Sequence, residues 1–142
     1  RLPIRYSHQL EYGGLYSGMA NYFPSGLPAD HVCFWDLRFR DADNQSRDSS
    51  AAAIAVCGMM EMDRQVGDDF PDRDVYRGAA ANILRSLIQN YTEQPAKPGA
   101  PILYHGVYSW HSGKGVDEGN IWGDYFYMEA LLRCIKDWNP YW

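Results

Sequence analysis

The sequence lacks the features that define several large classes of protein. It has no run of basic residues, and its 13 Lys and Arg stand against 18 Asp and Glu, a net charge of -5 that argues against a nucleic-acid partner. Its longest apolar run, residues 51–60, is too short to cross a bilayer and is followed by Glu61, Asp63 and Arg64. The N-terminal residues show no secretion-signal pattern. We therefore expect a protein that acts without nucleic acid and outside the membrane.

Cysteine is scarce, and the usual catalytic signatures are missing. Cys33, Cys57 and Cys134 lie too far apart to suggest a disulfide scaffold or a metal site, so we expect a reducing compartment, cytoplasmic with the periplasm as the alternative. No Gly-rich phosphate loop, nucleophile elbow or zinc signature is present, which removes the commonest nucleotide-binding, serine-hydrolase and metalloprotease functions. His105 and His111 have no Glu or Cys at ligand spacing, and we favour hydrogen-bonding or stacking roles for them.

Aromatic residues are what the sequence has in excess. They make up 15% of the chain, with 11 Tyr and 5 Trp, and many stand beside Gly, Ser, His or Asp rather than inside aliphatic runs. Such rings suit a surface on which other rings stack. The length of 142 residues and the hydrophobic content of 46% fit one domain with one core.

Three segments have the pattern of helices. Residues 51–62 are rich in helix formers and follow Asp48-Ser49-Ser50, whose side chains suit a helix N-terminus. Residues 77–91 carry apolar side chains at helical spacing. A third helix is expected to start near residues 117–120 and to end near residue 137. The predicted fold class is therefore all-α, built from stacked helical hairpins.

The segments between these helices have less regular patterns. Residues 1–23 are ambiguous between a helix and a loop, because paired glycines weaken either assignment. Residues 32–35 form a short apolar stretch that leads into a charged loop, residues 36–48. We treat this loop as a candidate functional surface.

Residues 108–114 form a predicted loop that concentrates polar and aromatic groups. The hydroxyls of Ser109 and Ser112 and the ammonium of Lys114 can bind a carboxylate or a sulfate, and Trp110 can stack on a sugar ring. The alternative is that Trp110 anchors a surface loop, the serines cap turns and Lys114 is solvated. Taken alone, the pattern favours this structural alternative.

Acid–base catalysis needs a carboxylate whose proton affinity is tuned by burial or by a charged neighbour. The carboxylates that the sequence permits for this role are Asp36, Asp48, Asp117, Glu118 and Asp124. Their spacing selects none of them. We interpret residues 47–50 as a helix start, with an active-site role for Arg47 as the minority alternative, and Asp124 as a residue that orients a buried partner beside the closely packed Gly123.

Residues 105–125 resemble the C-terminal signature of the unsaturated glucuronyl hydrolases, glycoside hydrolase family 88. Residues 46–54 resemble the second familiar block of that family, which follows a Trp-Asp pair present here as Trp35-Asp36. The match covers about residues 28–138, and residues 1–27 fall outside it. The resemblance implies an (α/α)6 barrel of six helical hairpins. Residues 1–142 would then form a single domain, the C-terminal portion of that barrel.

The resemblance also implies a reaction and a substrate. Members of the family remove the terminal unsaturated uronic acid from glycosaminoglycan oligosaccharides that lyases leave behind. An aspartic acid protonates C4 of the C4=C5 double bond, water adds at C5, and the hemiketal collapses, with no metal or organic cofactor. In sulfate-tolerant members a Ser-x-x-Ser-x-Lys motif holds the sulfate or the amino sugar at the second subsite. This motif falls on Ser109, Ser112 and Lys114, so we expect these three residues to bind substrate.

Both catalytic aspartates of the family lie upstream of the matched residues. We therefore expect no catalytic residue in this chain, and we expect the 142-residue chain alone to be inactive. Its helix faces would associate or limit solubility without their partner, the N-terminal half of the barrel. Two alternatives stay open: a non-catalytic module that binds anionic carbohydrate, and an unsaturated rhamnogalacturonyl hydrolase. The Ser-x-x-Ser-x-Lys spacing favours glycosaminoglycan fragments over pectin fragments.

Overall fold

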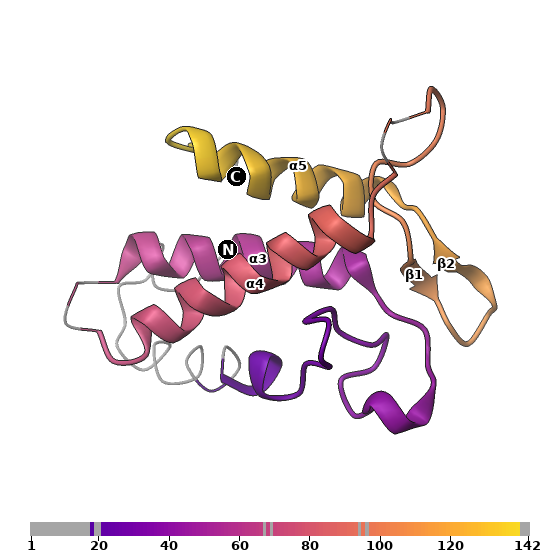
Figure 1. Ribbon diagram of the computed structural model, residues 1–142, viewed down its shortest axis with the longest axis horizontal. Coiled ribbons are helices and arrows are strands. Elements are labelled where there is room, and N and C mark those ends of the chain that lie inside the picture. The colour runs from indigo at the N-terminus through magenta and orange to yellow at the C-terminus, as the bar shows by residue number, and fades with distance from the viewer. Residues whose placement is uncertain are drawn as a thin grey trace.

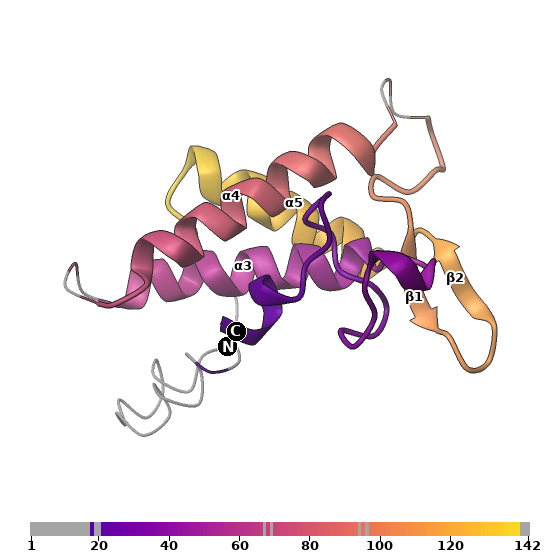
Figure 2. The same ribbon diagram turned by 60° about the horizontal axis from the view of Figure 1, so that its bottom comes forward.

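The computed structural model describes residues 18, 21–66, 68, 70–93, 95 and 97–139, and its regular elements are three long helices and one hairpin. The elements are a 3-10 helix η1 (Asp41–Asp43), helices α3 (Ser49–Gln65), α4 (Arg73–Asn90) and α5 (Ile121–Ile135), and strands β1 (Gly106–Ser109) and β2 (Lys114–Glu118). Helix α3 lies between α4 and α5, antiparallel to α4 and parallel to α5 (Figures 1 and 2). The hairpin projects from the end where α3 and α5 begin and α4 ends.

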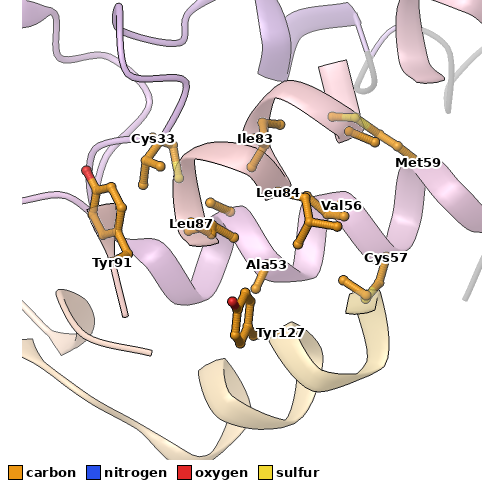
Figure 3. Packing of buried hydrophobic residues seen from close by; sticks show 14 of the residues in the cluster. Cys33, Ala53, Val56, Cys57, Met59, Ile83, Leu84, Leu87, Tyr91 and Tyr127 are labelled. Atoms are coloured by element: carbon orange, nitrogen blue, oxygen red, sulfur yellow. The ribbon is translucent and has the colours of Figure 1, made fainter. Parts of the chain in front are cut away.

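The core fills the space around α3. Small side chains such as Ala52 and Ala53 on α3 let the neighbouring helices approach closely, and both residues are fully buried. Figure 3 shows Ile83 and Leu87 of α4 and Tyr127 of α5 in this packing. Residues of the apolar stretch 32–34 are buried in the same core. The core therefore fixes the hairpin end of α3 together with the segment that precedes it.

Two helices begin at the side chains that the sequence favours for this purpose. The Asp48 carboxylate accepts hydrogen bonds from the backbone N–H groups of Ser50 and Ala51, at 3.1 and 3.2 Å, and thereby caps α3. The Asn120 side chain accepts a bond from the N–H of Gly123, at 2.7 Å, and caps α5. Because these N–H groups have no partner within the helix, the caps define where each helix starts.

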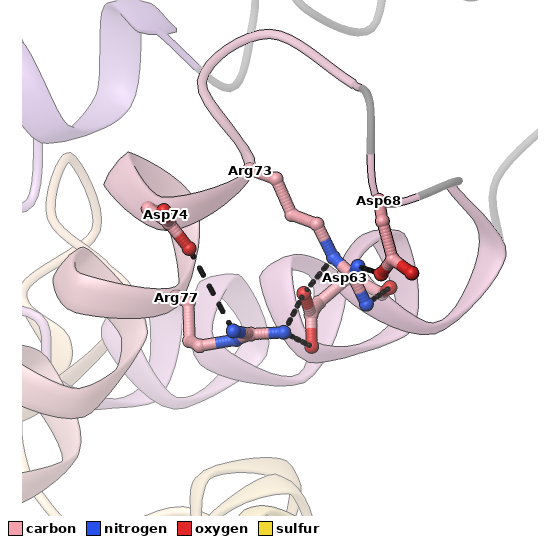
Figure 4. A network of polar contacts seen from close by, with 5 residues as sticks. All are labelled: Asp63, Asp68, Arg73, Asp74 and Arg77. Atoms are coloured by element: carbon pink, nitrogen blue, oxygen red, sulfur yellow. Dashed lines mark hydrogen bonds and ion pairs between the residues drawn. The ribbon is translucent and has the colours of Figure 1, made fainter.

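Charged residues hold the connection between α3 and α4 (Figure 4). Asp63 near the end of α3 accepts hydrogen bonds from Arg73, at 2.7 Å, and from Arg77, at 3.0 Å, both on α4. Arg73 also pairs with Asp68 in the connection, and Arg77 with Asp74 at 3.6 Å. This network joins the two helices at the end of the layer opposite the hairpin.

The structure confirms the three predicted helices and corrects two details. Residues 108–114, predicted as a loop, contain the end of β1 and the start of β2, because Gly113 and Gly115 adopt φ of 66° and 58° and so allow a tight reversal. The third helix starts at the predicted block, where Asn120 caps it, but Asp117 and Glu118 lie in strand β2 rather than in the helix start. Nearly all of the ambiguous residues 1–23 lie outside the described part of the chain. Among the described residues no helix is both long and apolar enough to span a membrane.

Candidate functional site

The hairpin brings two of the three predicted binding residues face to face. Strands β1 and β2 are antiparallel, and Ser109 at the end of β1 stands opposite Lys114 at the start of β2. Ser112 lies in the turn between them, and its hydroxyl donates to the backbone carbonyl of Ser109 at 3.3 Å. Lys114 is exposed and forms no ion pair with any residue that the structure describes. A hydroxyl and an uncompensated cation therefore share one small surface.

Trp110 anchors the hairpin to Trp35, the residue that directly precedes the charged loop at residues 36–48. Its ring stacks on that of Trp35, with centroids 4.7 Å apart and an interplanar angle of 9°. The His111 ring stands edge-on to Trp35, with centroids 5.6 Å apart, and the indole N–H of Trp35 donates to Gln45 at 3.1 Å. One face of Trp110 is thus occupied by protein, as in the anchoring role considered from the sequence. His111 therefore contacts an aromatic ring edge-on rather than stacking on it.

The base of the hairpin is bonded to the start of α3. The carboxylate oxygen of Asp48 that caps α3 also accepts from the Ser50 hydroxyl, at 2.6 Å, and from the N–H of Val107 in β1, at 3.3 Å. Ser50 Oγ in turn accepts from the indole N–H of Trp122 in α5, at 3.2 Å. One carboxylate therefore connects the hairpin with two helices, which is the structural use expected for Asp48.

Ser49 forms a second connection to the same segment. Its backbone N–H donates to the carbonyl of His105, at 3.0 Å, and its hydroxyl donates to the carbonyl of Tyr104, at 2.5 Å. Ser49 and Ser50 are both buried. The block at residues 46–54 and the block at residues 105–125 are therefore in direct contact, although about 50 residues separate them in the sequence.

A partly buried polar cluster lies next to this contact. Asp30 accepts hydrogen bonds from Arg47, at 3.2 Å, and from the hydroxyl of Tyr91, at 2.7 Å. The Arg47 guanidinium also lies over the Phe34 ring, 3.9 Å from its centroid, and bonds Asp41 at 3.3 Å. Burial, together with the Asp30 carboxylate, raises the pKa of the Tyr91 phenol. Arg47 therefore holds the charged loop in place, and the sequence offered no local signal for its link to Asp30 and Tyr91.

Asp36 and Asp124, two of the carboxylates permitted as acids, have structural partners. The side chain of Arg38 donates to Asp36 and, with its backbone N–H, holds the pKa of Asp36 below its usual value, which disfavours the protonated form that a general acid needs. Asp124 accepts from the backbone N–H groups of Ile102 and Leu103, at 3.0 and 2.9 Å. Gly123 packs against Ser50, where an added Cβ would lie 3.1 Å from the serine Cβ.

The cysteines do not add a nucleophile at the hairpin. Cys33 and Cys57 are buried, and burial raises the pKa of each thiol to about 12. A thiol needs its thiolate to attack, so these two are structural. Within the described residues, no three His, Cys, Asp or Glu side chains gather as they would around a metal ion.

The hairpin surface is a wall rather than a closed pocket. A groove of about 620 Å³ lies elsewhere, between α4 and α5 over the second half of α3, with Met60, Leu84 and Ile88 among its lining residues. A second hollow of about 400 Å³ lies beside the connection between α3 and α4. Ser109, Ser112 and Lys114 line neither of them.

Comparison with known proteins gives close relatives along nearly the whole chain. The unsaturated chondroitin disaccharide hydrolase of Streptococcus pyogenes serotype M1 is 58% identical over 141 residues, which are 99% of this chain and 35% of that protein. The unsaturated glucuronyl hydrolase of Bacillus sp. (strain GL1) is 35% identical over 124 residues, 87% of this chain and 33% of that protein. No protein-family model matches the chain.

A solved structure agrees with the fold. A mutant unsaturated glucuronyl hydrolase from Streptococcus agalactiae, complexed with dGlcA-GalNAc6S, superposes with a TM-score of 0.94 and 52% identity over 98% of this chain and 37% of its own. Such structures are (α/α)6 barrels, and this chain matches a part of one, which confirms the predicted fold class. The chain spans about a third of the length of the curated relatives it matches.

Proposed function

Because this chain belongs to the family of unsaturated glucuronyl hydrolases, glycoside hydrolase family 88, we propose that the intact protein removes the terminal unsaturated uronic acid from glycosaminoglycan fragments that lyases release. A proton adds to C4 of the C4=C5 double bond, water adds at C5, and the hemiketal opens to free the saturated sugar. The catalytic acid lies outside this chain, and no metal or organic cofactor takes part.

In this proposal the chain supplies the wall of the second subsite. Support comes from the hairpin, where the Ser109 position stands opposite Lys114 and Ser112 lies in the turn between them. A sulfate or the polar groups of an amino sugar would accept hydrogen bonds from the hydroxyls and the ammonium. The relative from Streptococcus agalactiae was solved with dGlcA-GalNAc6S, a sulfated disaccharide of this chemistry.

We further propose that residues 1–142 form a single domain, the C-terminal portion of the barrel, and that the other part of the barrel covers helix α5. Support comes from the apolar side chains that α5 leaves in contact with solvent. Ile121 is 82% exposed, Ile135 is 78% exposed and Met128 is 41% exposed, and the three lie along one stripe of the helix. An apolar stripe of this kind is typical of a surface that packs against another helix.

We also infer a cytoplasmic location for the intact protein. Support comes from Cys33, Cys57 and Cys134, which are all free thiols. Unpaired cysteines are usual where the compartment keeps thiols reduced.

The experiment that tests the function replaces Lys114 by alanine in the intact protein. We expect the Lys114→Ala variant to raise KM for a 6-sulfated unsaturated chondroitin disaccharide by about 10- to 100-fold, the range for a hydrogen bond to a charged group. Turnover is followed as loss of the enol absorbance. For the unsulfated disaccharide KM should change by less than about threefold, because no anion faces the lysine there.

Lys97→Ala is the matched control, since Lys97 is an exposed lysine outside the hairpin that pairs with Glu93 at 2.8 Å. It should leave KM for both disaccharides unchanged. Equal losses on the two disaccharides in the Lys114→Ala variant would contradict the assignment of the subsite. Saturable binding of the sulfated disaccharide without any loss of absorbance in the unmutated protein would favour a non-catalytic binding module.

A further inference from the structure

His105 and Asp117 form a hydrogen-bonded pair across the base of the hairpin. The imidazole Nδ1 lies 2.7 Å from a carboxylate oxygen of Asp117. The pair is half-exposed, with 48% and 59% of the two side chains accessible, so it is not part of the buried core. On its inner side the His105 ring stands edge-on to the ring of Tyr91, with centroids 5.7 Å apart. The role of the pair must therefore be sought at the hairpin surface.

Asp117 occupies the position that sets the strand register. Gly106 pairs with Glu118, but the next residue, Val107, pairs with Val116, so Asp117 is an extra residue in β2 with no partner on β1. Such a bulge re-aims every side chain beyond it. Beyond this bulge the register places Ser109 opposite Lys114. The face-to-face arrangement of the hydroxyl and the cation thus depends on a bulge at residue 117.

Both members of the pair adopt a backbone conformation that favours glycine. His105 has a φ of 64° and Asp117 a φ of 62°, in the left-handed region. Elsewhere in the same hairpin the chain uses glycine for this conformation, at Gly113 and Gly115. A bulge of this kind also commonly carries glycine. Glycine would be less strained at both positions. We therefore expect the side chains of His105 and Asp117 to have a specific role.

We propose that His105 and Asp117 are positioning residues that fix the register of the hairpin and so hold Ser109 and Lys114 at the spacing that binds the anion. The hydrogen bond joins the residue preceding β1 to the bulge residue of β2, and it prevents the bulge from moving along the strand. Neither residue contacts the anion in this arrangement. The inference rests on the proposed function only in taking the hairpin as the substrate-binding surface.

The test replaces each member of the pair by glycine in the intact protein, because glycine removes the side chain and relieves the backbone. Asp117→Gly and His105→Gly should each keep the Tm of the unmutated protein or raise it. Each should raise KM for the sulfated disaccharide about fivefold, the net effect of one hydrogen bond, and leave kcat within about twofold. The double variant should be no worse than either single variant, since the two side chains act as a unit.

A second measurement reports on the hairpin without substrate. The stacked pair Trp35 and Trp110 should give an exciton couplet in circular dichroism, identified as the signal that Trp110→Phe removes. We expect Asp117→Gly to reduce this couplet. We expect Asp117→Asn, which tolerates the left-handed conformation and keeps a hydrogen-bond acceptor, to restore both the couplet and KM.

The outcomes separate this inference from the function on which it rests. An unchanged couplet and an unchanged KM in the glycine variants, with Lys114→Ala still raising KM, would overturn the positioning role alone. If the glycine variants reduce the couplet but Lys114→Ala leaves KM unchanged, the positioning role is supported and the proposed subsite is wrong. A fall in Tm of the Asp117→Gly variant together with no rescue by Asp117→Asn would also overturn it.

Discussion

The two ends of the helical layer use charged side chains in opposite ways. At the hairpin end the carboxylates of Asp48 and Asp124 accept hydrogen bonds from backbone N–H groups, and Lys114 has no ionic partner among the described residues. At the other end Glu61 of α3 and Glu129 of α5 are buried and share Arg133. Charge at one end positions the backbone and leaves a cation available to a ligand. At the other end charge is neutralised within the protein and joins two helices.

The largest expected effect comes from removing Arg133. Its guanidinium donates to Glu61 at 3.0 Å and to Glu129 at 2.7 Å, and only 9% of its side chain is exposed. Arg133→Met would leave two buried carboxylates without their shared cation, and we expect the free energy of unfolding to fall by about 3 to 5 kcal/mol. Urea unfolding of the intact protein measures this change.

Lys97→Met supplies the control for that comparison. Its ion pair with Glu93 is exposed, with 70% and 47% of the two side chains accessible. Exposed pairs contribute about 0 to 1 kcal/mol, so this variant should be close to the unmutated protein in stability. If Arg133→Met were no more destabilising than Lys97→Met, the contrast between the two ends would be wrong.

A smaller effect is expected at the hairpin end from Asp48→Ala. The variant loses the cap of α3 and leaves the N–H of Val107 without its side-chain acceptor, which should lower the free energy of unfolding by about 1 to 2 kcal/mol. Because the same carboxylate ties the hairpin to α3, KM for the sulfated disaccharide should also rise. Asp48→Asn keeps a capping oxygen and should recover most of the stability. A loss of stability with KM unchanged would show that the cap does not position the hairpin.

Local signals in the sequence were sufficient for the three helices and for the starts of α3 and α5. Asp48 precedes a run of helix formers, and a side chain that caps a helix acts within three residues, so its role is visible in the sequence. The Ser-x-x-Ser-x-Lys spacing also needs only six consecutive residues, but its substrate-binding role was predicted from the family resemblance, because the pattern taken alone favours a structural role. The barrel and the substrate class came from the family resemblance rather than from these local patterns.

The hairpin and the polar pairs depend on distant or unusual geometry. Val107 and Val116 are too few to produce an alternating pattern, so the strands read as a loop. The contact of Tyr91 with Asp30 spans 61 positions, and that of His105 with Asp117 requires a bulge that no short pattern announces. The sequence identifies Glu61 only as a charge that follows an apolar run. Its burial could not be predicted, because a buried carboxylate needs a charged partner and only the fold brings Arg133 beside it.

The smallest expected effect is the contribution of Glu61 to the pH dependence of stability, which is absent near neutral pH and appears only in acid. It tests the same contrast between the two ends of the helical layer. Burial raises the pKa of this carboxyl, but hydrogen bonds from Arg64, Gln65 and Arg133 outweigh burial and lower the pKa to about 2 from an ordinary 4.5. A carboxyl with a lower pKa in the folded state stabilises the protein above its ordinary pKa, and this contribution is lost as the pH falls from about 4.5 to about 2. The fall in Tm across this window should be steeper in the unmutated protein than in Glu61→Gln, and equal slopes would place the acid-sensitive group elsewhere in the molecule. Because the ionised form prevails well above pH 4.5, this contribution does not change between pH 6 and pH 8 in the unmutated protein, so any change of Tm there has another source.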